Sequence, residues 1–210
     1  VMSPDSTVKE AIQGKLIVWI FAMRFLMDFC SGIAYFVNQA ISSAKYKGKK
    51  EFDFEEPLMR LIWIAATLCI STSFIMSYLL ISDLAVIKDG VLTPMPNVWW
   101  QLAMIISCGT LAAVLIPEFT KIFTSSKSKH VQEIVTASRE GGASLTILSG
   151  IVSGNFSAFY MGMLIAFLLG IAYFVSLFIP PEVINYPSIF AFGLVAYGFL
   201  CMGPVNIAVD

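Results

Sequence analysis

The stretch LMRLIWIAATLCISTSFIMSYLLI, residues 58–81, decides the fold class of this chain. It contains one charged residue, Arg60, which lies near its start. An α-helix rises about 1.5 Å per residue, so about 20 apolar residues are needed to cross the hydrocarbon core of a bilayer. The stretch therefore predicts a membrane-spanning α-helix.

Four further runs have the same apolar character, and they cover residues 16–37, 98–116, 145–178 and 189–210. The run at 145–178 is longer than a bilayer requires, so we expect its helix to tilt, kink or project into water. Residues 1–210 are therefore predicted to be a single transmembrane region, an all-α polytopic helix bundle with about five membrane-spanning helices.

The composition supports a membrane protein. Hydrophobic residues make up 58% of the chain and charged residues only 13%, and the mean hydropathy is +0.81. An average soluble domain has about 25% charged residues, and a water-soluble fold of this length could not bury so much apolar surface. The formal net charge is −1, so charge gives no indication of a nucleic acid partner.

Basic residues gather in two of the segments between the apolar runs. Residues 38–57 and 117–144 are rich in lysine and arginine, whereas the segment before residue 98 holds only Lys88. Short cytoplasmic loops carry an excess of these residues, so loops 38–57 and 117–144 are predicted to be cytoplasmic. Three aromatic residues, which are common anchors at a membrane interface, would then lie at the outer face: Trp99, Trp100 and Tyr186.

Small residues recur every four positions along the fourth apolar run. They are Gly150, Gly154, Ala158, Gly162, Ala166 and Gly170. Small residues at this spacing lie on one helix face and let two helix backbones approach closely. The alternative is that Gly and Ala are simply common in membrane helices. The unbroken series favours a close-packed interface, either within the bundle or between subunits.

Ionisable side chains are rare within the apolar runs. Arg24 and Asp28 lie four residues apart in the first run, so they share a helix face and could pair. Three interpretations remain open: a structural ion pair, a role in an ion pathway, or a helix shifted so that one of the two residues reaches water. Asn155 in the fourth run is either an interhelical hydrogen-bond partner or a ligand.

No metal site or nucleotide-binding motif is apparent. The single His130 has no further ligand at metal-binding spacing. Each cysteine lies in a different apolar run, where a free thiol acts as a small hydrophobic side chain: Cys30, Cys69, Cys108 and Cys201. There is also no P-loop, dinucleotide fingerprint or nucleophile elbow.

Both ends of the chain indicate an internal fragment of a longer protein. Val1 is not an initiator methionine, and residues 207–210 contain no helix stop signal. We therefore expect this segment to be inactive by itself.

Two segments resemble a known family. Residues 137–144, ASREGGAS, precede a glycine-rich run and resemble the S-C-R-T-G-A-A-T segment of membrane-bound, ion-translocating pyrophosphatases. Residues 198–210, GFLCMGPVNIAVD, resemble the helix that leads into the D-x-Y-G-P-x-x-D-N-A segment of this family, with Asp210 as its first aspartate. Departures from the family pattern are Glu140-Gly141-Gly142 in place of T-G-A, and Pro204 and Asn206 in the last helix.

The resemblance implies a fold and an activity. The five runs would be helices seven to eleven of a sixteen-helix protein that hydrolyses pyrophosphate at its cytoplasmic face. Hydrolysis would be coupled to proton or sodium transport across the bilayer. Mg²⁺ would be the cofactor, with K⁺ as a further candidate. Asp210 would lie at the cytoplasmic mouth of the catalytic site.

The resemblance also implies an assembly and a location. The protein would be a homodimer in which the fourth run lies at the subunit contact, and it would reside in a prokaryotic plasma membrane. A secondary transporter or channel without hydrolytic activity is the alternative, with Arg24, Asp28 and Asn155 near a permeation path. A membrane enzyme of lipid metabolism is a third possibility.

Overall fold

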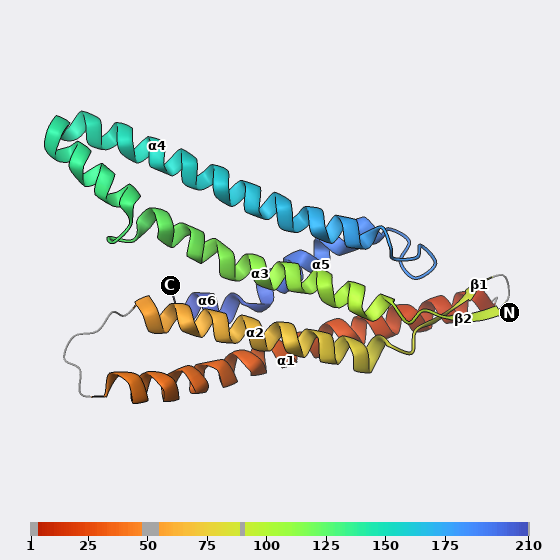
Figure 1. Cartoon of the computed structure of the whole chain (residues 1–210). Helices are drawn as coiled ribbons and strands as arrows, with labels where there is room; N and C mark the ends of the chain where they lie inside the picture. Colours follow the sequence, from red (N-terminus) through yellow and green to blue (C-terminus); the bar gives the residue numbers. More distant parts are fainter. Residues whose placement is uncertain (1–3, 48–54, 89–90, 210) are drawn as a thin grey trace.

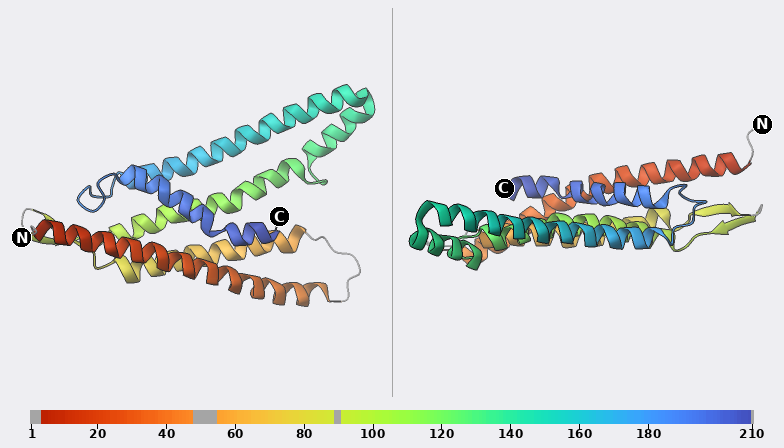
Figure 2. Two further views of the ribbon diagram at one scale, coloured as in Figure 1. Left: turned by 180° about the vertical axis from the view of Figure 1, so that it is seen from behind. Right: turned by 90° about the horizontal axis from the view of Figure 1, so that it is seen from above.

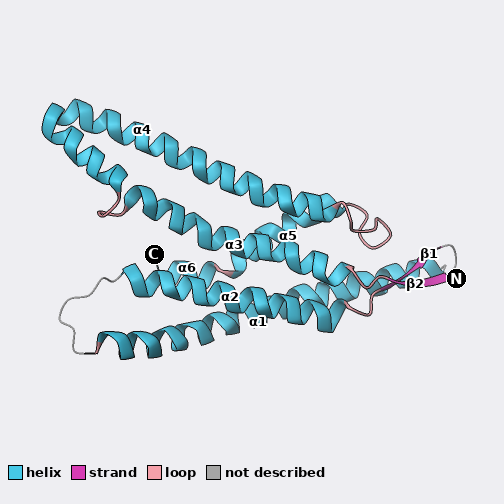
Figure 3. Ribbon diagram, viewed as in Figure 1, coloured by secondary structure: helices cyan, strands magenta, loops and turns pink. Residues whose placement is uncertain are grey.

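The computed structural model describes residues 4–47, 55–88 and 91–209. They form an elongated arrangement of helices with one short hairpin (Figures 1 and 3). In chain order the elements are α1 Pro4–Tyr46, α2 Glu55–Ile81, β1 Ala85–Lys88, β2 Val91–Pro94, α3 Val98–Thr124, α4 Lys129–Ser176, α5 Pro187–Cys201 and α6 Gly203–Val209. The strands β1 and β2 pair antiparallel and connect α2 to α3.

The helices fulfil the prediction of a polytopic membrane bundle. Within the described residues, Val8–Tyr46, Glu55–Ile81 and Val98–Ser176 are long and apolar enough to cross a membrane. The pair α5 and α6, bent by 41°, makes a fourth candidate if it is one span. Val98–Ser176 contains both α3 and α4, so the five predicted runs fall on α1, α2, α3, α4 and the α5–α6 pair.

The helices pack mainly against their neighbours in the chain. Contacts join α1 to α2, α2 to α3 and α3 to α4, while α5 lies against both α3 and α4. Large side chains fill these interfaces, among them Trp19, Met23 and Ile105, which are fully buried. Many others face outward, and Phe25 is 75% exposed. Such an apolar outer surface suits contact with lipid or with further helices.

The helices extend beyond the apolar runs that predicted them. Much of the predicted loop 38–57 is helical because α1 continues to Tyr46, and much of 117–144 is helical because α3 continues to Thr124 and α4 begins at Lys129. Hydropathy marks the length that matches a bilayer, whereas a helix continues into polar surroundings because its backbone hydrogen bonds are internal. The cytoplasmic location of these segments stays a prediction.

The long helix α4 is bent sharply at Gly142. This residue has φ 62° and ψ −149°, a conformation that is essentially restricted to glycine. The residues before the bend fold back along those after it, and Ile134 and Ala137 line a shared groove with Leu148 and Val152 (Figure 1). The bend lies just before the apolar run 145–178 and outside it, so the tilt, kink or projection expected of that run stays a prediction.

Two helix backbones come into direct contact between α3 and α5, which cross as Figure 2 shows from behind. A Cβ added to Gly198 would lie 2.4 Å from the Ile106 carbonyl oxygen, and one added to Gly109 would lie 2.1 Å from the Val195 carbonyl oxygen. Two glycines in different helices thus allow direct backbone contact.

The predicted small-residue stripe on α4 makes no such contact within the described chain. A Cβ added to Gly150, Gly154, Gly162 or Gly170 would meet nothing within 4 Å. The stripe is therefore not an interface within this bundle segment. Its use between subunits stays a prediction.

Candidate functional site

Arg24 and Asp28 form the ion pair that their spacing predicts. Arg24 Nε lies 3.3 Å from Asp28 Oδ2, and the two side chains are 39% and 43% exposed in this chain. Both lie in the middle of α1, within the apolar run, where an unpaired charge would be costly.

Arg24 also reaches the end of α5. Its Nη1 donates a hydrogen bond to the Leu200 carbonyl oxygen at 2.9 Å. In a continuous α-helix this oxygen would accept a hydrogen bond from the backbone N–H of residue 204. Residue 204 is proline, which has no N–H. The backbone N–H of Met202 also points to the Leu200 carbonyl oxygen, and the guanidinium of Arg24 adds a side-chain donor in place of the missing N–H of residue 204.

A second proline-freed carbonyl lies in α3. Pro117 is inside this helix, so the Ala113 carbonyl oxygen lacks its usual backbone donor. Asn206 Nδ2, from α6, donates to that oxygen at 3.2 Å. Asn206 Oδ1 is buried and accepts no hydrogen bond from any described residue.

Tyr197 adds a further connection between α1 and α5. Its hydroxyl donates to the Ile20 carbonyl oxygen at 2.6 Å, one turn of α1 before Arg24. Cys201, at the last position of α5, is fully buried. The break at Met202 is therefore flanked by polar contacts to α1 on one side and to α3 on the other.

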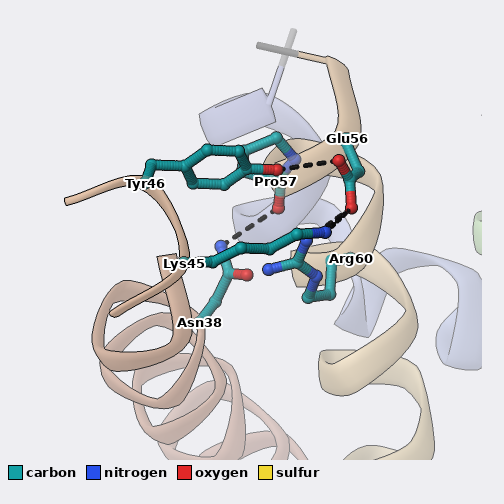
Figure 4. Close-up of polar contacts among 6 residues, drawn as sticks. All are labelled: Asn38, Lys45, Tyr46, Glu56, Pro57 and Arg60. Atoms are coloured by element: carbon teal, nitrogen blue, oxygen red, sulfur yellow. Dashed lines mark hydrogen bonds and ion pairs between the residues drawn. The ribbon is translucent and has the colours of Figure 1, made fainter. Parts of the chain in front are cut away.

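A separate polar cluster joins the end of α1 to the start of α2 (Figure 4). Glu56 is its centre. One carboxylate oxygen, Oε1, accepts hydrogen bonds from Lys45 and Arg60, the latter at 2.8 Å, and Oε2 accepts one from the Tyr46 hydroxyl at 2.8 Å. Asn38 Nδ2 donates to the Pro57 carbonyl oxygen at 3.0 Å nearby.

Two contacts connect this end of α2 to α3. Lys121 Nζ lies 3.4 Å from Glu55 Oε2, and Trp63 Nε1 donates to Glu118 Oε1 at 2.9 Å. Glu118 thus accepts a hydrogen bond from α2. Helix α6 contacts α2, and the end of α6 points toward the start of α2 (Figure 1). The Glu56 cluster and the end of α6 therefore lie at the same end of the bundle.

Apart from Cys201, which lies beside Arg24 and Tyr197, the other residues singled out in the sequence are not brought to either cluster. Asn155 is exposed on α4 and makes no hydrogen bond to any described residue. His130 stacks on Phe123, with ring centroids 4.7 Å apart. All four cysteines are free and buried. Asp210 lies outside the described residues.

The described part of the chain offers no ready metal site. No group of three or more His, Cys, Asp or Glu side chains lies close enough together there to hold a metal ion. The described residues therefore do not fit the Mg²⁺ that the family resemblance implies.

No signal in the sequence pointed to Tyr197, and the roles of Asn206 and Pro117 were not predicted. A proline inside an apolar run was a usable signal, because it frees the carbonyl four residues earlier and creates a need for a donor from elsewhere. The identity of that donor depends on tertiary packing.

The fold and its apolar surface define the class: this is an integral, multi-pass α-helical membrane protein. A family model described as inorganic H+ pyrophosphatase matches residues 3–210. The chain is also 48% identical over 200 residues to the K(+)-insensitive pyrophosphate-energized proton pump of Chlorobaculum tepidum. The match covers 95% of this chain and 26% of the relative, so the chain spans about a quarter of the relative's length. The chain belongs to the inorganic H+ pyrophosphatase family.

Proposed function

We propose that this chain is the middle portion of a membrane pump that hydrolyses pyrophosphate and uses the energy to move protons. The observation that carries the proposal is the 48% identity to a pyrophosphate-energized proton pump over 95% of the chain. Proton transport is preferred over sodium transport because that relative is named as a proton pump.

The chain's own contribution is to place α6 and the residue that follows it. The α5–α6 pair leads directly to Asp210, which we assign to the cytoplasmic mouth of the catalytic site. The basic side chains in residues 38–57, where α1 ends and α2 begins, and in residues 117–144, where α3 ends and α4 begins, would then face the cytoplasm, as the positive-inside rule expects.

Mg²⁺ remains part of the proposal for the whole protein. It would neutralise the phosphate charges and orient the attacking water. Because no group of three or more ligand side chains lies among the described residues, we assign no ligand and no step to it here. We also propose that activity does not require K⁺, since the relative is named K(+)-insensitive.

The exposed stripe on α4 supports a homodimer. Its glycines have open space before them in this chain, so a helix of a second subunit could approach closely. A prokaryotic plasma membrane is the proposed location, which agrees with the bacterial source of the relative.

The proposal is tested by measuring phosphate release from pyrophosphate with the purified full-length protein. We expect hydrolysis that requires Mg²⁺ and proceeds at the same rate with and without K⁺. A folded protein that releases no phosphate from pyrophosphate under these conditions would refute the proposal and favour a transporter. Hydrolysis only when K⁺ is present would refute the potassium part alone.

A further inference from the structure

Two prolines, Pro204 at the break between α5 and α6 and Pro117 inside α3, each remove a helical backbone donor, and a side chain from another helix donates to each freed carbonyl. Pro204 leaves the Leu200 carbonyl without its helical donor, and Arg24 Nη1 lies 2.9 Å from that oxygen. Pro117 does the same to the Ala113 carbonyl in α3, and Asn206 Nδ2 lies 3.2 Å from that oxygen. In both cases the donor comes from another helix.

Such compensation matters most in a lipid environment. Water is absent from the hydrocarbon core, so a carbonyl without a donor remains unsatisfied there. A proline in a membrane helix is tolerated when a neighbouring helix restores the hydrogen bond. The two side-chain donors therefore make the two prolines compatible with the membrane.

The two contacts also fix the direction of α6. Arg24 holds the last turn of α5 from the side of α1, and its guanidinium is oriented by Asp28 at 3.3 Å. Asn206 holds α6 itself from the side of α3. The backbone contact between Gly109 and Gly198 fixes where α5 crosses α3. These contacts act on both sides of the break and at the crossing point, and together they hold α6 in its direction relative to α1 and α3.

We infer that Arg24 and Asn206 are positioning residues: each donates to a carbonyl that lost its backbone donor to proline, and together they hold the direction of α6, the helix that leads in the sequence to Asp210. This role rests on the proposed function. It gives the Arg24–Asp28 pair a purpose without placing either residue on an ion pathway.

The inference is tested with a double-mutant cycle in the full-length protein. Arg24→Met removes the donor, and Pro204→Ala restores a backbone N–H opposite Leu200. We expect Arg24→Met to lower the melting temperature clearly in the Pro204 background and much less in the Pro204→Ala background. Arg24→Met also leaves Asp28 unpaired, but this effect is common to both backgrounds and cancels in the cycle.

A second double-mutant cycle uses Pro117 in α3 and its partner Asn206. Asn206→Leu should lower the melting temperature less when combined with Pro117→Ala than alone. This second cycle still tests the inference if the Arg24→Met variant does not fold. Arg139→Met, in the first part of α4, serves as the control and should act equally in the wild-type and Pro204→Ala backgrounds.

The turnover number kcat for pyrophosphate separates an effect on the position of α6 from an effect on stability. At a temperature where both variants are folded, Arg24→Met should reduce kcat for pyrophosphate by about tenfold or more through misplacement of α6, with KM nearly unchanged. Arg24→Lys, which keeps a charged donor, should recover part of kcat. Equal effects of Arg24→Met on melting in both proline backgrounds, or an unchanged kcat, would overturn the inference. The melting cycles do not depend on hydrolysis. If only the proposed function is wrong, the wild type will not hydrolyse pyrophosphate, but Arg24→Met will still lower the melting temperature less in the Pro204→Ala background.

Discussion

Gly198 is the residue through which the backbone of α5 meets that of α3. Its backbone faces Ile106 and Gly109, and no side chain separates the two helices at this point. A methyl group here would have to displace backbone, and a packed backbone yields much less readily than the end of a flexible side chain. Stability at this crossing therefore depends on a missing side chain.

We predict that Gly198→Ala destabilises the full-length protein by about 1–3 kcal/mol, a typical cost of overpacking. The added Cβ would lie 2.4 Å from the Ile106 carbonyl oxygen, and α3 and α5 would have to separate. The measurement is the melting temperature in detergent. Gly193→Ala is the matched control on the same helix, because its Cβ would meet nothing within 4 Å. Equal melting temperatures for the two variants would contradict the backbone contact.

At the scale of elements, two features depend on particular side chains. The helix ends of α1 and α2 are joined through Glu56, which accepts hydrogen bonds from Lys45, Tyr46 and Arg60. The bend in α4 depends on Gly142 and its positive φ. Each feature yields a separate prediction.

We predict that Gly142→Ala destabilises the bend by about 1–3 kcal/mol, since φ 62° with ψ −149° is strained for any residue with a Cβ. Open space around the position does not relieve this cost, because the strain lies in the backbone. Limited proteolysis of the 117–144 region should become faster in this variant. Gly14→Ala, at an open helical position in α1, should cleave at the wild-type rate, and equal cleavage of both variants would argue against the bend.

We predict that Glu56→Gln lowers the melting temperature at low ionic strength and has a smaller effect at high ionic strength. The carboxylate is surface-exposed, so salt screens its attraction to Lys45 and Arg60. Glu133→Gln is the control, because that carboxylate is 77% exposed and lies 4.0 Å from His130. A salt-independent loss for Glu56→Gln would show that packing, and not charge, links α1 to α2.

The sequence predicted the elements better than their contacts. Apolar runs identified each long helix because bilayer thickness imposes a minimum length, and the spacing of Arg24 and Asp28 predicted their ion pair because both lie on one helix. Helix ends were missed because polar residues such as Lys45 continue a helix outside the apolar run. The contact of Gly109 with Gly198 was missed because it joins two helices, and each glycine alone has no distinguishing spacing.

At the scale of the whole molecule, this chain is a bundle segment with much apolar surface left uncovered. Phe159 and Phe167 of α4 are more than half exposed, and the small-residue stripe runs along the same helix. Because the chain spans 26% of its relative, we expect further helices or a second subunit to cover part of this surface.

We predict that Gly162→Leu in the full-length protein reduces the fraction of dimer. The new side chain has room in this chain, since a Cβ at Gly162 meets nothing within 4 Å, but it would obstruct close approach by a second subunit. Oligomeric state is read by size-exclusion chromatography with light scattering. Gly14→Leu makes the same change at an open position of α1 and should leave the dimer intact. An unchanged dimer in Gly162→Leu would remove the stripe from the subunit contact.

Proton transport driven by pyrophosphate is tested most directly in sealed vesicles that contain the full-length protein with its cytoplasmic face outward. Pyrophosphate is added outside, and a pH-sensitive dye follows the internal pH. We predict acidification of the interior that requires Mg²⁺, needs no added Na⁺ or K⁺, and collapses with a protonophore. Pyrophosphate hydrolysis with no change in internal pH would contradict it.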